Sequence, residues 1–232
     1  MKYLIVLLLI ILPFTGQHTN AQGKCSKYYP MTEGSFVTLT MYDVDDVSQG
    51  KVTYKVDKVV GDTGEYTYTM ESRGMVLSSS QYNVECTDDG VEIDFKSMAG
   101  GMLARYSDME ADIQGSNIYL PNDLADYLAT SGPLLPESSM ELVVTTPAGT
   151  QRISMKMTNR TIEGTETLNG PNGEEFDCHI VSYDMIMNMG TTIASHTKQW
   201  LAEGVGVVKM LDYAEDKTTL RGSMLLTDYN VN

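Results

Sequence analysis

The sequence predicts a mainly β protein, an antiparallel β-barrel or half-open β-roll with one short helix. Apolar and polar residues alternate with a period of two in many segments from residue 35 onward, which is typical of strands with one buried face. Turn residues separate these segments at intervals of about 8 to 15 residues, a spacing that suits a barrel or sandwich. No long helical pattern alternates with the strands, as a parallel sheet would require.

The first half of the chain contains three clearly alternating segments, residues 51–57, 65–71 and 91–96. Each places Val, Ile, Tyr, Met or Phe on one face and charged residues or Thr on the other. Residues 61–64 have the sequence Gly-Asp-Thr-Gly, and residues 88–90 have the sequence Asp-Asp-Gly. Both combinations are typical of tight turns, so we expect hairpins here.

One short helix, of only one or two turns, is predicted at residues 121–130. This segment has early acidic residues and good helix formers, and it places Leu124 and Leu128 four residues apart. Gly132 and Pro133 follow and would end the helix.

The second half repeats the alternation at residues 153–157, 181–189 and 205–213, and a last strand is expected at 220–226. Residues 169–173 form another turn signal. Inward positions of this half carry many of the chain's 16 methionines. Flexible thioethers can line an adaptable apolar cavity or serve as ordinary core filler. The candidate cavity-lining residues are Met155, Met157, Met185, Met187 and Met189.

Residues 1–21 are predicted to be a secretory signal peptide. Lys2 precedes an apolar run at residues 4–14, and Ala21 offers a small residue for cleavage. The run is shorter than the about 20 apolar residues that a membrane-spanning helix needs. We therefore expect export to the periplasm or cell surface and no transmembrane segment after cleavage. Residues 22–232 are interpreted as one β-rich domain, and a division into two halves near residue 135 stays open.

The three cysteines predict one disulfide and one free thiol in an oxidising compartment. Cys86 and Cys178 are the favoured pair because both lie in strand-like segments, whereas Cys25 lies near the new N-terminus. The other pairings and three free thiols are the alternatives. A lipidated Cys25 is disfavoured because Lys24 precedes it, where lipoprotein processing requires a small residue.

The charge balance is strongly acidic, with 16 Lys and Arg against 31 Asp and Glu. Nucleic acid is therefore not an expected partner. Asp43, Asp45 and Asp46 lack the Gly and Glu of a calcium loop, and no zinc, nucleotide or nucleophile motif is present. We expect no metal or cofactor and no enzymatic activity. A Ser-His-Asp triad built on His196 stays open, because triads are defined by geometry rather than by sequence order.

Four stretches together resemble the TapB-like secreted or periplasmic bacterial proteins, relatives of a domain group of unknown function. They are residues 29–34, 120–124, 170–178 and 200–208. The resemblance implies an exported antiparallel barrel or half-open roll without a known reaction, and it supplies no catalytic residues.

The last of these stretches contains Trp200, Glu203, Gly204 and Gly206. Within the resemblance, the two glycines suggest a bulge or a close backbone approach in a strongly curved sheet. Trp200 is expected to plug one end of the barrel, and stacking of Trp200 on a ligand is the alternative.

The predicted function is an exported, non-enzymatic protein that binds a hydrophobic small molecule or an envelope protein. A structural or adhesive surface protein without a small ligand is the second hypothesis. A hydrolase with an unrecognised site is the third.

Overall fold

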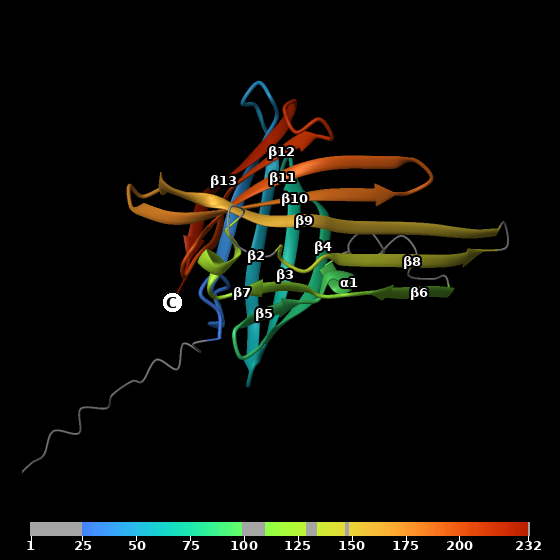
Figure 1. The fold of residues 1–232 in the computed structure, drawn as a ribbon, viewed down its shortest axis with the longest axis horizontal. Helices are drawn as coiled ribbons and strands as arrows, with labels where there is room; N and C mark the ends of the chain where they lie inside the picture. The colour runs from blue at the N-terminus through green and yellow to red at the C-terminus, as the bar shows by residue number, and fades with distance from the viewer. Residues whose placement is uncertain (1–24, 99–109, 129–133, 147–148, 232) are drawn as a thin grey trace, which may run out of the picture.

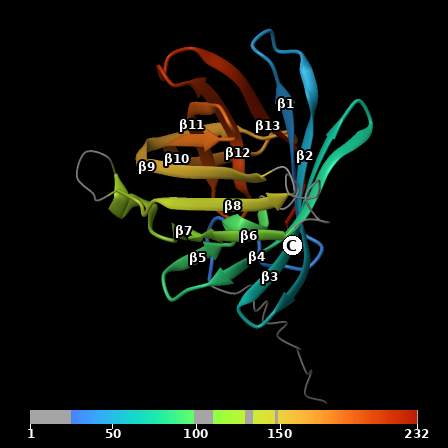
Figure 2. The same ribbon diagram turned by 90° about the vertical axis from the view of Figure 1, so that its right-hand side faces the viewer.

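A computed structural model describes residues 25–98, 110–128, 134–146 and 149–231. These residues form one antiparallel sheet of 13 strands with a single short α-helix and a 3-10 turn. The sheet is strongly curved and rolls up without closing (Figures 1 and 2). The predicted fold class, a half-open β-roll with one short helix, is thereby confirmed. The predicted signal peptide, residues 1–21, lies outside the described residues.

The strands and helical turns follow one another along the chain with short connections. In chain order they are β1 (Phe36–Tyr42), β2 (Ser48–Val60), β3 (Thr63–Ser72), β4 (Met75–Cys86), β5 (Gly90–Ile93), α1 (Phe95–Met98), β6 (Glu110–Gly115), β7 (Ile118–Pro121), η2 (Leu124–Tyr127), β8 (Ser138–Thr146), β9 (Gly149–Asn169), β10 (Glu175–Asn188), β11 (Thr192–Ala202), β12 (Gly206–Ala214) and β13 (Leu220–Asn230).

Most strands pair with the next strand along the chain. The order across the sheet is β6-β8-β9-β10-β11-β12-β13-β1-β2-β3-β4-β5-β7. The two edge strands, β6 and β7, are consecutive pieces of chain separated only by Ser116 and Asn117, and they lie end to end (Figure 1). β6 pairs with β8, whereas β7 pairs with β5. Residues 110–121 therefore serve both edges of the sheet, which brings these edges close together and creates a seam.

The turn signals predicted from the sequence connect strands in the structure. Gly61 and Asp62 join β2 to β3, and residues 170–174 join β9 to β10. Arg73 and Gly74 form a two-residue connection between β3 and β4, and their φ angles are 51° and 74°. Positive φ at both central positions is the geometry that matches the twist of a hairpin.

Within the short helix predicted at residues 121–130, the described residues form one turn, the 3-10 turn η2, and residues 129–130 lie outside the described part of the chain. Asp123 makes no side-chain capping hydrogen bond there, and a single helical turn depends on packing rather than on propensity. The α-helix α1 is instead started by Asp94, whose carboxylate accepts hydrogen bonds from the backbone of Lys96 and Ser97. Among the described residues, no helix is long and apolar enough to span a membrane.

Buried side chains form two large clusters on opposite faces of strands β10, β11 and β12. Along β11, Gln199 and Leu201 face the inside of the roll, whereas Trp200 and Ala202 face the other way. The inner cluster comprises Tyr28, Val56, Tyr66, Tyr82, Val84, Val91, Ile93, Phe95, Ile118, Leu120, Leu124, Leu135, Met140, Met157, Ile162, Val181, Tyr183 and Leu201. The outer cluster comprises Val37, Leu39, Cys178, Trp200, Ala202, Val205, Val208 and Leu226.

Candidate functional site

Part of the inner cluster lines a cavity of about 250 Å³, together with Val37 and Val205 of the outer cluster. Its wall is built by strands from both halves of the sheet and by residues 28–30. Concave, mostly apolar spaces with a few polar groups are the usual form of small-molecule sites. The apolar and aromatic side chains of this wall include Tyr54, Val56, Tyr66, Ile93, Phe95, Ile118, Leu120, Met157, Val181, Tyr183, Met185, Leu201, Val207 and Met210.

Four of the lining tyrosines keep their protons at neutral pH. Burial raises the pKa of Tyr29 and of Tyr183 to about 12. It also raises the pKa of Tyr54 and of Tyr66 well above the usual value. Gln199 Nε2 donates a hydrogen bond to Tyr183 Oη over 3.0 Å. These hydroxyls therefore place no negative charge in the cavity, and that of Tyr66 donates to the carbonyl of Pro30.

Among the described residues that line the cavity, Arg160 of β9 is the only one with a charged side chain. It is only 3% exposed. Its Nη1 donates to the carbonyl of Pro136 over 2.7 Å, and its Nη2 donates to the carbonyl of Tyr119 over 2.8 Å. The Nε atom is buried and has no hydrogen-bond partner among the described residues. Burial lowers the pKa of Arg160 to about 10, so the guanidinium stays charged at neutral pH.

A β-bulge turns Arg160 toward the cavity. The strand pairing places two residues of β9, Asn159 and Arg160, opposite one residue of β10, Tyr183. Asn159 has a φ of 52°, a left-handed conformation that Asn tolerates better than most residues. Met157 and Arg160 both line the cavity, although three positions along an unbroken strand would place them on opposite faces.

The sequence pattern alone does not single out Arg160. Continuing the alternation of Met155 and Met157 would place residue 159 inside and residue 160 outside. The available signal is the break in this alternation at an Asn in mid-strand, because such breaks are typical of bulges, and bulges are common beside functional sites.

Residues 25–35, named here the N-terminal strap, cover the end of the cavity where β4 and β11 end. Tyr28, Tyr29 and Pro30 of the strap contribute to the cavity wall. Gly204, in the turn after β11, donates its backbone N–H to the carbonyl of Lys27 over 2.6 Å. The strap is therefore joined both to the sheet and to the cavity that it covers.

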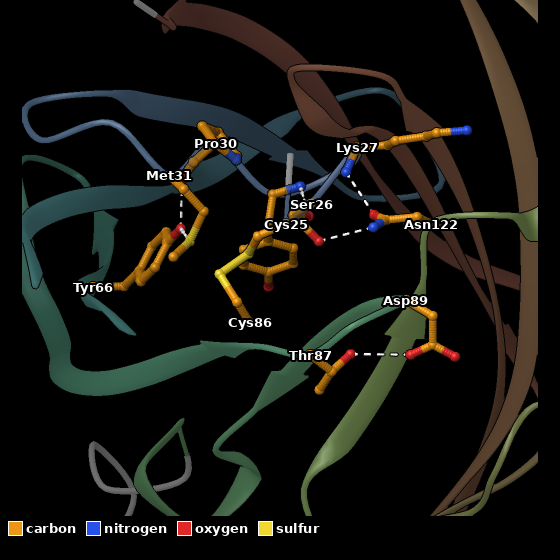
Figure 3. The surroundings of a disulfide bond; sticks show 11 residues. Cys25, Ser26, Lys27, Pro30, Met31, Tyr66, Cys86, Thr87, Asp89 and Asn122 are labelled. Carbon is orange, nitrogen blue, oxygen red and sulfur yellow. Dashed lines mark hydrogen bonds between the residues drawn. A yellow bond between two sulfur atoms is a disulfide. The ribbon is translucent and has the colours of Figure 1, made fainter. Parts of the chain in front are cut away.

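The predicted disulfide between Cys86 and Cys178 is wrong. Cys86 is bonded to Cys25 of the strap, with 5.3 Å between the two Cα atoms, as Figure 3 shows. In the same region, the side chain of Asn122 accepts from the backbone N–H of Lys27 and donates to the carbonyl of Cys25, both over 2.8 Å. The prediction failed because the strap folds back onto the end of β4.

Cys178 is a free thiol buried in the outer cluster. Burial, with smaller effects of Asp177 and Glu166, raises its pKa to about 11. Thiols that stay protonated are poor nucleophiles, so Cys178 serves as a small apolar side chain.

The five candidate methionines occupy different environments. Met157 and Met185 line the cavity. Met155 packs against the inner cluster without lining the cavity. Met187 is half-buried and belongs to neither cluster, and Met189 is exposed at the end of the β10 hairpin. The alternation of apolar and polar residues in β9 and β10 therefore continues beyond the part of the sheet that lines the cavity.

Trp200 lies in the outer cluster and does not line the cavity, so it does not plug the roll from inside. Its Nε1 donates to Glu166 over 2.6 Å, and Lys209 Nζ lies 4.3 Å from the centroid of its ring. Glu203 and Gly204 are exposed in the turn between β11 and β12. Gly206 starts β12 with a φ of 95°, and a Cβ there would lie 2.8 Å from the carbonyl oxygen of Tyr28.

His196 forms the acid-imidazole half of a triad without the nucleophile. Its Nδ1 lies 2.7 Å from Asp184 Oδ1, and the same carboxylate also accepts from Asn159 and Lys217. Among the described residues, no Ser, Thr or Cys is hydrogen-bonded to the His196 ring. The arrangement is a polar network across β10 and β11.

A second depression, of about 380 Å³, lies beside the outer cluster. It is lined by residues 168–171 and Phe176 of the β9–β10 hairpin and by Val208, Lys209 and residues 225–226. Leu225 is 40% exposed. This groove is open to solvent and, unlike the cavity, has no buried charged group among its lining residues.

Residues 32–226 match the family described as DUF3108-like. No curated protein matches the chain significantly in sequence.

Two solved structures have a similar fold. One, from Bacteroides fragilis, is provisionally described as an exported protein with a YmcC-like fold, and has a TM-score of 0.67 and 21% identity over 89% of this chain and 100% of that chain. The other, from Parabacteroides distasonis, is provisionally described as a lipoprotein, and has a TM-score of 0.70 and 22% identity over 89% of this chain and 99% of that chain. At these identities, the likeness shows a shared fold.

Proposed function

We propose that this chain, which belongs to the DUF3108-like family, is an exported protein that binds an apolar small molecule in the cavity inside its sheet. The observation that carries the proposal is the cavity itself, with its apolar and aromatic wall and the strap over one end. Export is supported by the predicted signal peptide and by the descriptions of the two structural relatives. The finer TapB-like assignment stays a prediction.

The wall of the cavity favours an apolar occupant. Most of its lining side chains are apolar or aromatic, and removing apolar surface from water is favourable by roughly 25 cal/mol per Å². An apolar guest would cover this surface and remove it from water.

The chemistry of the wall favours binding over catalysis. The tyrosine hydroxyls are protonated and neutral, and the one described histidine-carboxylate pair, His196 with Asp184, lies among the outward-facing residues of its strands. We therefore propose that the protein works without a cofactor and without turning over its ligand.

Filling the cavity tests this proposal. We expect octan-1-ol to bind the purified mature protein saturably in isothermal titration calorimetry. Val181→Phe places a ring in the cavity and should weaken binding at least tenfold. Ile186→Phe adds the same ring on the same strand at a position that is 41% exposed, so it should bind like the wild type. Absence of saturable binding, or equal binding by both variants, would contradict the proposal.

A docking function is the second candidate, because apolar side chains are exposed near one rim of the sheet. Val44 and Val47 lie in the β1–β2 connection, and Met75, Val76 and Leu77 start β4, each more than half exposed. For this function, replacing Met75, Val76 and Leu77 with Ser should abolish retention of the protein in the envelope fraction while leaving octan-1-ol binding intact. Unchanged retention would eliminate this candidate.

A further inference from the structure

We infer that the ligand of the cavity carries a carboxylate, which binds the buried guanidinium of Arg160 while the rest of the ligand occupies the apolar space. This inference rests on the proposed binding function and specifies its ligand class, a medium-chain carboxylic acid. The observation behind it is a charged, buried side chain that lines an apolar cavity and has an unused donor.

The guanidinium lacks both a counter-ion and a full set of acceptors among the described residues. A guanidinium has five N–H donors. Two hydrogen bonds are accounted for, and both acceptors are neutral carbonyls, of Pro136 and Tyr119. Buried charges are normally paired, because removing a charge from water is costly. A carboxylate on the ligand would supply the missing charge and accept from Nε.

A purely structural role explains only part of this geometry. Tyr119 belongs to edge strand β7, and Pro136 lies just before the start of β8. By donating to both carbonyls, Arg160 of β9 links the chain on the two sides of the seam. These two hydrogen bonds involve Nη1 and Nη2, but they leave Nε buried without a partner in a residue that lines the cavity.

Tyr183 is placed to support the same head group. It faces Arg160 across the bulge. Its Oη accepts a hydrogen bond from Gln199 over 3.0 Å, and burial keeps the hydroxyl protonated. A second carboxylate oxygen of the ligand would compete for this proton with Thr197, the other hydrogen-bond partner of the hydroxyl.

The volume of the cavity limits the ligand. At about 30 Å³ per small non-hydrogen group, the value for water in the liquid, 250 Å³ holds about eight such groups. Octanoate would place the eight carbon atoms of its chain in this volume and its two carboxylate oxygens against Arg160, so it is a suitable probe. The acidic surface of the protein opposes an approaching anion, but this long-range repulsion is screened over about 8 Å at physiological ionic strength.

The test compares ligands that differ only in the head group, on the unmodified mature protein. Calorimetry is expected to show octanoate binding at least tenfold more tightly than octan-1-ol, because a charge-assisted hydrogen bond is lost in the alcohol. With Arg side chains labelled with ¹⁵N, the Nε resonance of Arg160 should shift on addition of octanoate and stay in place with octan-1-ol.

Two variants assign the preference to this residue. Arg160→Gln should remove the preference for octanoate, whereas Arg152→Gln should keep it. Arg152 is on the same strand, but it is exposed and paired with Glu141. If Arg160→Gln fails to fold because the seam is lost, the wild-type ligand comparison and the Nε resonance decide the question without it.

The outcomes separate this inference from the proposed function. Equal affinity for octanoate and octan-1-ol, or an unshifted Nε resonance, would overturn the carboxylate assignment while leaving apolar binding in place. Tighter binding of octyl phosphate than of octanoate would also overturn it, in favour of a phosphate head group. If neither the alcohol nor the acid binds, the proposed function itself fails.

Discussion

The inner and outer clusters lie on opposite faces of the same strands and are built in different ways. The outer cluster is centred on Trp200, which is nearly buried, and its indole N–H is paired with Glu166. The inner cluster leaves a cavity and keeps Arg160 with an unused donor. Under the proposed function, the outer cluster mainly stabilises the curved sheet, whereas the inner cluster gives up part of its packing to hold a guest.

The largest expected effect is in the outer cluster. Trp200→Ala should lower the free energy of unfolding by about 4 kcal/mol, a typical cost of removing a large buried aromatic side chain. Octan-1-ol affinity per folded molecule should not change, because Trp200 faces away from the cavity. Urea denaturation and calorimetry measure the two quantities. A loss of octan-1-ol affinity in the folded fraction would contradict the separate roles of the two clusters and would place the indole in the ligand site.

The disulfide between Cys25 and Cys86 fixes the strap to the end of β4. Cys86→Ser removes a link between residues 61 apart in sequence and should cost about 3 kcal/mol, mostly through the entropy of the unfolded chain. It should also speed ligand dissociation, since the strap covers one end of the cavity. Cys178→Ala serves as the outer-cluster control and should leave dissociation unchanged.

Thiol titration of the denatured, unreduced wild-type protein checks the same pairing. One reactive thiol is expected, from Cys178. Cys86→Ser should expose two, and three in the wild type would rule out the bond to Cys25.

Gly204 lies in an exposed turn, whereas Gly206 lies against the strap, so substitutions at these two positions can be compared. Gly206→Ala should lower the free energy of unfolding by about 2 kcal/mol, because a strained φ adds to the close approach of Tyr28 O. Gly204→Ala also has a positive φ but meets nothing within 4 Å, so it should cost only about 1 kcal/mol. Chemical denaturation of the two variants measures the difference. Equal losses of unfolding free energy in the two variants would mean that the backbone at Tyr28 moves away from the new side chain without a cost in stability.

The smallest effect concerns the polar network on the outside of β10 and β11. Burial raises the pKa of Asp184, but hydrogen bonds from His196, Asn159 and Lys217 lower it more, so the net direction is down. The ionised Asp184 therefore adds stability above the pKa of the unfolded carboxyl, and this contribution is lost as the pH falls through the lower folded-state pKa.

Asp184→Asn removes this contribution. It should cost about 1 kcal/mol at pH 7, and the gap to the wild type should narrow below about pH 4. Denaturation at pH 7, 5 and 3 tests the sign. A gap that widens on acidification would show that the carboxylate does not gain from its partners, and a change in ligand affinity would tie this network to the cavity.

Local patterns predicted the strands well and the site only in part. Alternation at residues 51–57 and 181–189 and the turn at residues 169–173 depend on neighbours in sequence, so they can be recognised without knowing the fold. The short helix near Leu124 was also predicted, but its 3-10 geometry was not, because the type of a single turn depends on packing rather than on propensity. Met157 and Met185 lie where the alternation places them, but the same alternation misplaces Arg160, since the bulge at Asn159 shifts the side chains that follow.

By itself, the sequence determined the β class, the positions of most hairpins and the two-sided character of the strands, because all three arise from interactions between residues close in the chain. Only the tertiary structure decided that Cys25 meets Cys86, that residues 110–121 serve both edges of the sheet, and that Arg160 turns inward. Each of these depends on the register between distant segments, and a shift of one residue reverses the face on which a side chain lies.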